Sequence, residues 1–161
     1  MPIYSKAHSW GGNSISQNLF TYLDAILPGG KTILELGSGW ASAELAKYWN
    51  VISIEDDEEW FKKYHPQAFL VPKTSPEGWY DRDILKQALS GLKYDLLLID
   101  GPWDGRKHFP DHLDLFDTSV TMVFDDVRRA VGQEVIRKVS EAVGREYTII
   151  GESGSMFGVI E

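Results

Sequence analysis

The chain has 161 residues, enough for one domain with a core of its own and too few for two ordinary domains. It contains no cysteine, which excludes disulfides, thiolate metal ligands and a cysteine nucleophile. Its net charge of −8 favours a cationic ligand and argues against a nucleic-acid partner, although solubility alone also accounts for an acidic surplus.

No stretch approaches the roughly 18 apolar residues that would span a bilayer. The N-terminal residues, MPIYSK, lack the apolar run of a secretion signal. We therefore expect a cytoplasmic protein that has no membrane partner.

The first half of the chain alternates helix and strand signals. Ser14 and Gln17 have the spacing of a helix-capping box, and apolar residues then recur at helical spacing until Pro28 and two glycines end the helix. The elements expected after it are a strand at 32–36, a helix at 41–49, a strand at 51–54, a helix at 58–64 and a strand at 68–71.

The second half continues this alternation. Its run at 94–99 is almost entirely apolar, which is typical of a parallel strand covered on both faces by helices. The other expected elements are a helix at 81–89, a breaker-rich loop at 100–105, a strand at 120–124, a helix at 133–143 and a hairpin of strands at 147–150 and 156–160. The pattern predicts βαβ units and a single domain, with residues 14–161 as the core and the glycine-containing segment 1–13 as a lid.

A glycine-rich turn follows the first strand. In the segment ELGSGWAS, a short strand runs through Gly37 and Gly39 directly into a helix, an arrangement that brings backbone close to a nucleotide. The dinucleotide fingerprint would place a third glycine where this chain has Ser42. Glu35 precedes the first glycine, and a carboxylate at a strand end can hold an ammonium group. Glu55 ends the next strand, close to the interval of about 20 residues at which an acid binds a ribose.

These residues carry a family resemblance that covers the whole chain. The segment 35–41 resembles the E/D-x-G-x-G-x-G first motif of the class I S-adenosylmethionine-dependent methyltransferases, with Ala41 in place of the last glycine. The segment 51–55 is similar to the family's second strand, whose terminal acid binds the ribose. The segments 94–102 and 123–129 resemble its fourth and fifth strands with their loops, and Arg106 stands where small bacterial members carry an arginine.

The resemblance implies a Rossmann-like, doubly wound α/β sheet of seven strands in the order 3-2-1-4-5-7-6. The seventh strand would be antiparallel, as the terminal hairpin also predicts, with helices on both faces. S-adenosylmethionine would be the methyl donor and S-adenosylhomocysteine the product, with Asp57 as another acid able to share the ribose role. The residues expected to bind the cofactor are Glu35, Gly37, Ser38, Gly39, Glu55, Asp56 and Asp100.

Methyl transfer from a sulfonium mainly requires that the acceptor be positioned, and a base helps if the acceptor is a hydroxyl or an ammonium group. We predict catalytic roles for Asp100, His108 and Asp125, although a loop histidine is more often an ordinary surface residue. The acceptor would be a small molecule or sugar, methylated on oxygen or nitrogen. Further candidates on the same loops are Asp104, Asp111, His112 and Asp126.

Three alternatives stay open. Asp100, Asp125 and Asp126 end adjacent strands and could hold Mg²⁺, as in the similar catechol-type O-methyltransferases. Those enzymes have asparagine in place of the third acid and a different fourth-strand loop, so we expect no divalent metal. The chain could also be a non-catalytic cofactor-binding subunit. Finally, four tryptophans lie in predicted loops or turns near the expected cofactor site: Trp10, Trp40, Trp79 and Trp103. They either pack against other side chains or cover the cofactor through cation–π contact.

Overall fold

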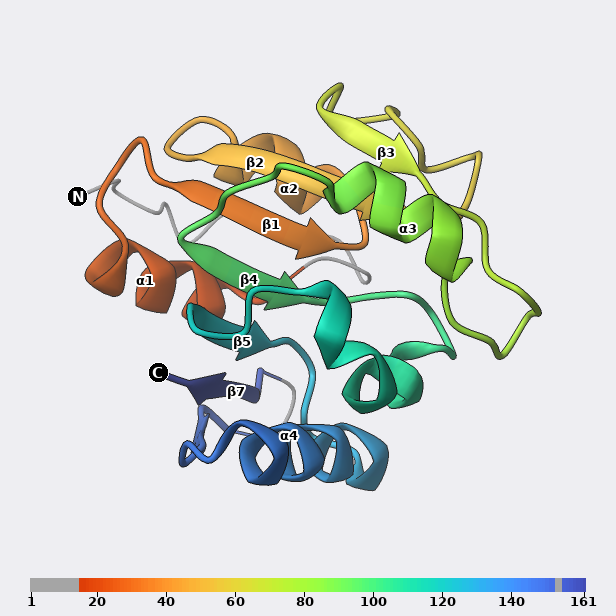
Figure 1. The fold of residues 1–161 in the computed structure, drawn as a ribbon. Coiled ribbons are helices and arrows are strands. Elements are labelled where there is room, and N and C mark those ends of the chain that lie inside the picture. Colours follow the sequence, from red (N-terminus) through yellow and green to blue (C-terminus); the bar gives the residue numbers. More distant parts are fainter. Residues whose placement is uncertain (1–14, 153–154) are drawn as a thin grey trace.

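The computed structural model describes residues 15–152 and 155–161 (Figure 1). The expected lid at 1–13 and the expected cap Ser14 lie outside the described residues. The first helix, α1 (Gln17–Ile26), has Ser16 at its N-cap, and the Ser16 hydroxyl accepts a hydrogen bond from the Leu19 amide at 3.1 Å. The prediction of the cap is therefore wrong by two residues, because the side chain three positions before Leu19 is the one that reaches its N–H group.

Seven strands form one sheet in the predicted order, β3-β2-β1-β4-β5-β7-β6. Strands β1 to β5 are parallel, and β7 is antiparallel to both β5 and β6, which confirms the predicted topology. The strands are β1 (Thr32–Leu36), β2 (Asn50–Glu55), β3 (Ala68–Leu70), β4 (Leu96–Ile99), β5 (Thr121–Phe124), β6 (Thr148–Ile150) and β7 (Phe157–Ile160).

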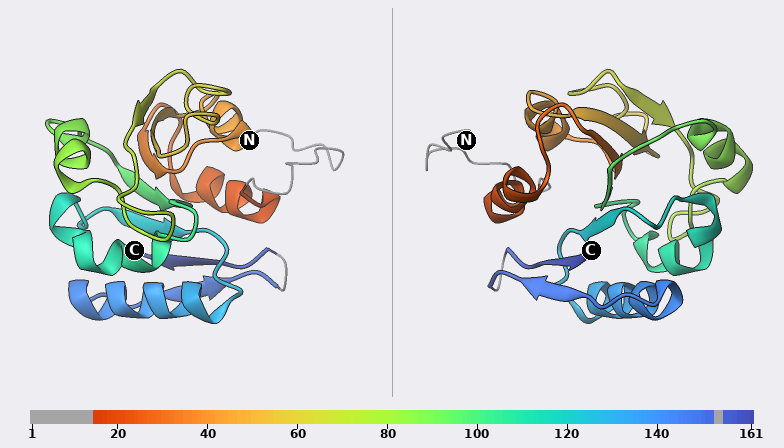
Figure 2. Two further views of the ribbon diagram at one scale, coloured as in Figure 1. Left: turned by 90° about the vertical axis from the view of Figure 1, so that its right-hand side faces the viewer. Right: turned by 60° about the vertical axis from the view of Figure 1, so that its left-hand side comes forward.

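Helices cover both faces of the sheet, as Figure 2 shows. On one face α1 and α2 (Trp40–Leu45) bury Leu19, Leu23 and Leu45 against Ile33 and Val51. The opposite face carries α3 (Arg82–Leu89), the 3₁₀ helix η1 (Arg106–Leu115) and α4 (Ala130–Val143). Because neighbouring strand residues point to opposite faces, the apolar runs of the central strands supply both cores.

The register of the central strands determines where the site lies. Leu36, the last residue of β1, pairs with Ile54 of β2 and with Ile99 of β4. The next residues along the three strands are Gly37, Glu55, which is the last residue of β2, and Asp100, and the register therefore brings them to one edge.

Three predicted elements differ from the structure. Residues 58–63 form turns rather than a helix, because Lys62 has a left-handed backbone with φ of +57°. Helix α2 ends at Leu45, four residues earlier than predicted. The segment between β4 and β5, predicted as loop, contains η1, which includes Pro110 and is kinked at His112.

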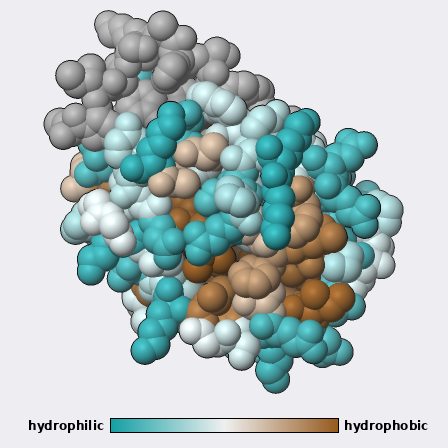
Figure 3. All heavy atoms as spheres, turned by 90° about the horizontal axis from the view of Figure 1, so that it is seen from above, coloured by the Kyte–Doolittle hydropathy of each residue, from teal (hydrophilic) through white to brown (hydrophobic). Residues whose placement is uncertain are grey.

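The sheet has a short edge strand at β3, which leaves Phe69 40% exposed. A view from above onto this edge shows hydrophilic side chains over most of the surface, with one hydrophobic patch (Figure 3). Within the part of the chain that the structure describes, no helix has the length and apolar character needed to cross a membrane.

Candidate cofactor-binding and catalytic site

The glycine turn after β1 is packed against the loop after β4. Gly37 has φ of +98°, and a Cβ atom built on it would lie 3.3 Å from the backbone nitrogen of Gly101. The Gly101 amide also donates to the Leu36 carbonyl oxygen at 2.6 Å. Both the left-handed conformation and the close backbone contact require glycine at position 37.

Gly39 is a glycine that the packing of the protein does not require. Its φ of −166° is extended backbone, and the nearest atom that an added Cβ would meet is a ring carbon of Trp60 at 4.0 Å. A side chain at Gly39 would therefore fill open space next to the turn. Such space suits a ligand that approaches the backbone closely, which makes Gly39 the best fit to a cofactor cradle.

Glu55 ties the glycine turn to the end of β2. One carboxylate oxygen accepts from the Ser38 amide at 2.9 Å and the other from the Asp57 amide at 2.8 Å. Burial raises the pKa of Glu55 to about 7. Each oxygen keeps a lone pair for a further donor. The Ser38 hydroxyl beside this carboxylate is buried and has no hydrogen-bond partner among the described residues, which leaves a polar group available to a ligand.

Glu35 lies beneath the turn, in the interior of the sheet. It is 3% exposed, and one of its oxygens accepts from the hydroxyls of Ser53, at 2.7 Å, and Ser42. Burial raises the pKa of Glu35 to about 8. Ser42 also accepts from the Gly39 amide at 3.0 Å, so the chain of contacts from Glu35 through Ser42 fixes the position of Gly39. The expected contact of Glu35 with an ammonium group stays a prediction.

Asp100 and Asp125 lie together, as their places at the ends of β4 and β5 predict. Burial raises the pKa of both carboxyl groups, and the nearby Asp100 charge raises that of Asp125 further. The Arg106 guanidinium lies 3.9 Å from Asp100 and donates to the Asp125 carbonyl oxygen.

Asp126 pairs with an arginine rather than with Asp100. Its carboxylate accepts from the Arg128 guanidinium at 2.8 Å, and its backbone φ is +49°. Of the three acids considered for a metal site, Asp126 is thus paired with an arginine on the surface side. Among residues 15–152 and 155–161 the structure contains no group of three or more histidine, aspartate or glutamate side chains suited to a metal ion.

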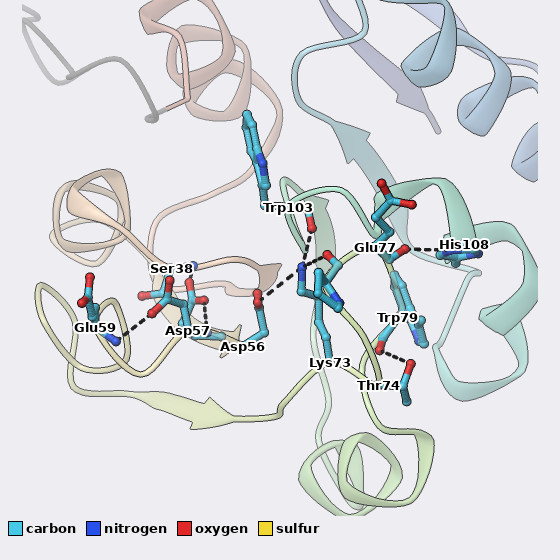
Figure 4. Close-up of polar contacts among 12 residues, drawn as sticks. Ser38, Asp56, Asp57, Glu59, Lys73, Thr74, Glu77, Trp79, Trp103 and His108 are labelled. Atoms are coloured by element: carbon cyan, nitrogen blue, oxygen red, sulfur yellow. Dashed lines mark hydrogen bonds and ion pairs between the residues drawn. The ribbon is translucent and has the colours of Figure 1, made fainter.

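His108, a predicted catalytic residue, lies on η1 against the loop at 73–80. Its Nε2 atom donates to the Glu77 carbonyl oxygen at 3.0 Å (Figure 4). The ring of its neighbour His112 stacks on Trp79, with 5.1 Å between ring centroids. The catalytic role of His108 stays a prediction.

Lys73 connects the loop after β4 with Asp56 at the end of β2, and the sequence analysis did not predict a role for it. Its ammonium group donates to the carbonyl oxygens of Pro76 and Trp103, both at 2.7 Å, and lies 3.9 Å from the Asp56 carboxylate (Figure 4). Burial raises the pKa of Asp56, and Lys73 opposes this shift. A single lysine in a predicted loop provides no sequence signal for such a contact.

Other contributors also escaped the sequence analysis. Tyr80 is buried, its hydroxyl has no hydrogen-bond partner within the described part of the chain, and its pKa is raised well above the usual range by burial and by the charges of the surrounding acids. The structure also shows Ser53 and Ser42 in contact with Glu35, which the sequence did not predict. The polar Ser53 within the apolar run 51–54 was the one signal that could have identified a partner for Glu35.

No protein-family model matches the chain, and no curated protein matches it. Solved structures do match its fold. A methyltransferase from Pyrococcus furiosus has a TM-score of 0.59 and 17% identity, covering 98% of this chain and 85% of that one. A precorrin 8W decarboxylase from Methanobacterium thermoautotrophicum has a TM-score of 0.60 and 13% identity, over 90% and 89% of the two chains. A tRNA methyltransferase from B. subtilis has a TM-score of 0.55 and 16% identity, over 91% and 65%.

The chain thus has the fold of the class I S-adenosylmethionine-dependent methyltransferases, which confirms the resemblance seen in the sequence at the level of the fold. The matched proteins are named for different substrates, including precorrin 8W and a tRNA. The fold by itself therefore leaves the acceptor open.

Proposed function

We propose that this protein binds S-adenosylmethionine at the carboxyl edge of its sheet and transfers the methyl group to a small acceptor. The observation that carries the proposal is the open space in front of Gly39, within a glycine turn that Glu55 ties to β2. When bound, S-adenosylmethionine supplies an electrophilic methyl group on a positively charged sulfur. Backbone at Ser38 and Gly39 would hold its methionine part, and Glu55 its ribose.

The charge of the site supports a cationic ligand. Glu35, Glu55 and Asp125 are buried, and the pKa of each is raised, so their ionised forms are poorly solvated. The cations that contact this edge are Lys73, beside Asp56, and Arg106, beside Asp100. A sulfonium and an ammonium group would offset the remaining negative charge.

Asp100 is the residue we propose as the base. The Arg106 guanidinium lies 3.9 Å from Asp100 and favours its ionised form, whereas burial and the Asp100 charge raise the pKa of the neighbouring Asp125. Burial raises the pKa of Asp100, which makes its carboxylate a better proton acceptor. A hydroxyl or ammonium group of the acceptor would give its proton to an Asp100 oxygen as the methyl group is transferred.

We propose a small acceptor and no nucleic acid. The net charge of −8 would repel a polyanion. Methyl transfer from radiolabelled S-adenosylmethionine to separated RNA, protein and small-molecule fractions of a lysate tests this point. Label in the RNA fraction would contradict it.

Isothermal calorimetry tests the cofactor directly. S-adenosylmethionine and S-adenosylhomocysteine are expected to bind, and NAD is expected to bind much more weakly. Tighter binding of NAD would overturn the proposal. Cofactor binding without methyl transfer to any fraction, together with stable association with another protein, would instead identify a cofactor-binding subunit.

Replacing Glu55 with alanine is expected to weaken S-adenosylmethionine binding by about 1–3 kcal/mol, the range for hydrogen bonds to a charged group. The change removes the proposed ribose acceptor and also frees the Ser38 amide of the glycine turn. Calorimetry measures the effect, and Glu58→Ala, an exposed acid three positions further on, is the matched control. Equal affinities of the two variants would transfer the ribose role to Asp56 or Asp57.

Removal of divalent metal by EDTA is expected to leave cofactor binding and methyl transfer unchanged. The donor set at the ends of β4 and β5 is poorly suited to Mg²⁺, because Asp126 pairs with Arg128 and burial favours the neutral form of Asp125. Methyl transfer measured with EDTA and then with added Mg²⁺ checks this. Loss of activity with EDTA and its return with Mg²⁺ would support the catechol-type alternative.

A further inference from the structure

Trp103 is the most exposed large apolar side chain among the described residues. It is 68% exposed, whereas the next, Val131, is 59% exposed. Figure 4 shows its indole pointing away from the contacts of Lys73, and it follows Asp100 by three positions on the same loop. An indole in this position adds little to the core, and exposed tryptophans of this kind commonly form binding contacts.

The backbone beneath this indole is held firmly. The Trp103 carbonyl oxygen accepts from the Lys73 ammonium group at 2.7 Å. Two positions further on, a Cβ atom added to Gly105 would lie 2.0 Å from the Gly78 carbonyl oxygen, so the loop packs closely against the segment at 73–80. The loop backbone is therefore held in place, while the Trp103 indole is exposed. A backbone held in this way lowers the entropy cost of binding a ligand on that indole.

We propose that Trp103 is the platform on which the methyl acceptor lies, and that the acceptor is a ring carrying a hydroxyl group. This inference rests on the proposed function. The flat apolar face of a ring would contact the indole, and its hydroxyl would donate to the Asp100 carboxylate. The Asp100 carboxylate, to which the hydroxyl would donate, disfavours an anionic ring. Pyranose and phenol rings share this chemistry.

The test uses two probes, methyl β-glucopyranoside for a pyranose and catechol for a phenol. Each is titrated into protein saturated with S-adenosylhomocysteine, and the indole N–H signals are followed by NMR, with the Trp103 signal assigned by its absence in Trp103→Phe. One probe is expected to shift the Trp103 signal. Trp103→Ala is expected to weaken that probe's binding by about fivefold to tenfold, the scale of an aromatic contact, while Trp103→Phe retains most of it.

Controls separate this inference from the proposed function. S-adenosylhomocysteine affinity is measured for each variant and is expected to be unchanged in Trp103→Ala, because the indole is placed on the acceptor side. Val131→Ala, at another exposed apolar residue, is expected to leave probe binding unchanged. Binding of S-adenosylhomocysteine with no shift at Trp103 from either probe, or equal probe affinity in Trp103→Ala, would overturn the platform. Failure of wild-type protein to bind S-adenosylhomocysteine would overturn the proposed function instead.

Discussion

Replacing Gly39 with valine is expected to weaken S-adenosylmethionine binding by about 100-fold or more, equivalent to about 3 kcal/mol. The fold is expected to be retained, because Gly39 has extended backbone and, among the described residues outside its chain neighbours, an added Cβ would come closest to a ring carbon of Trp60, at 4.0 Å. The valine side chain would occupy the space that we assign to the cofactor. Calorimetry measures the affinity, and thermal unfolding measures the stability of the ligand-free protein.

Gly37→Val is the matched comparison, and its main effect is expected on the stability of the ligand-free protein. Its backbone φ of +98° is strained for valine, and the Cβ would lie 3.3 Å from the Gly101 nitrogen. We expect a loss of about 1–3 kcal/mol in the free energy of unfolding, on the scale of a strained backbone conformation. Unchanged cofactor affinity in Gly39→Val would show that no ligand approaches this part of the turn and that the glycine motif has only a structural role.

Raising the pH is expected to destabilise the ligand-free protein through Glu35. The pKa of this carboxyl group rises from 4.5 to about 8 on folding, so between these values the folded state binds more protons than the unfolded state. Its contribution to stability is therefore lost as the pH rises from about 4.5 to about 8, with an upper limit of roughly 5 kcal/mol.

Glu35→Gln is expected to remove this part of the pH dependence and to stabilise the protein above pH 8 relative to wild type. The amide oxygen of glutamine can still accept from Ser42 and Ser53. Denaturant unfolding at a series of pH values provides the measurement, and Glu146→Gln, at an exposed position, provides the control. Parallel stability curves for wild type and Glu35→Gln would show that Glu35 is already ionised in the folded protein.

The two glycines of the turn have different roles. Gly37 is required by its backbone conformation and by packing, whereas Gly39 borders open space. The two acids likewise act in different ways, because Glu55 contacts the turn through the Ser38 amide and Glu35 acts through Ser42. We expect variants of Glu35 to change the position of Gly39 and variants of Glu55 to change ligand contacts directly.

The sequence by itself predicted βαβ units and a mainly parallel sheet, because a parallel strand needs a crossover and the apolar runs need cover on both faces. The strand order 3-2-1-4-5-7-6 followed from the family resemblance of the motifs, and the structure has that order. Gly37 and Asp100 follow β1 and β4, and Glu55 is the last residue of β2, so their proximity follows from strand order and register. These features depend on local pattern and chain connectivity, both of which can be read along the chain.

Only the tertiary structure decided which partner each polar side chain takes. Asp125 and Asp126 are adjacent in sequence, yet one interacts with Asp100 and the other with Arg128, because the left-handed backbone at Asp126 turns its side chain away. Lys73 contacts Trp103 across 30 positions of the sequence. The turns at 58–63 and the helix η1 likewise depend on packing that outweighs weak local preferences. Contacts between distant segments arise only when the chain is folded, so no local pattern encodes them.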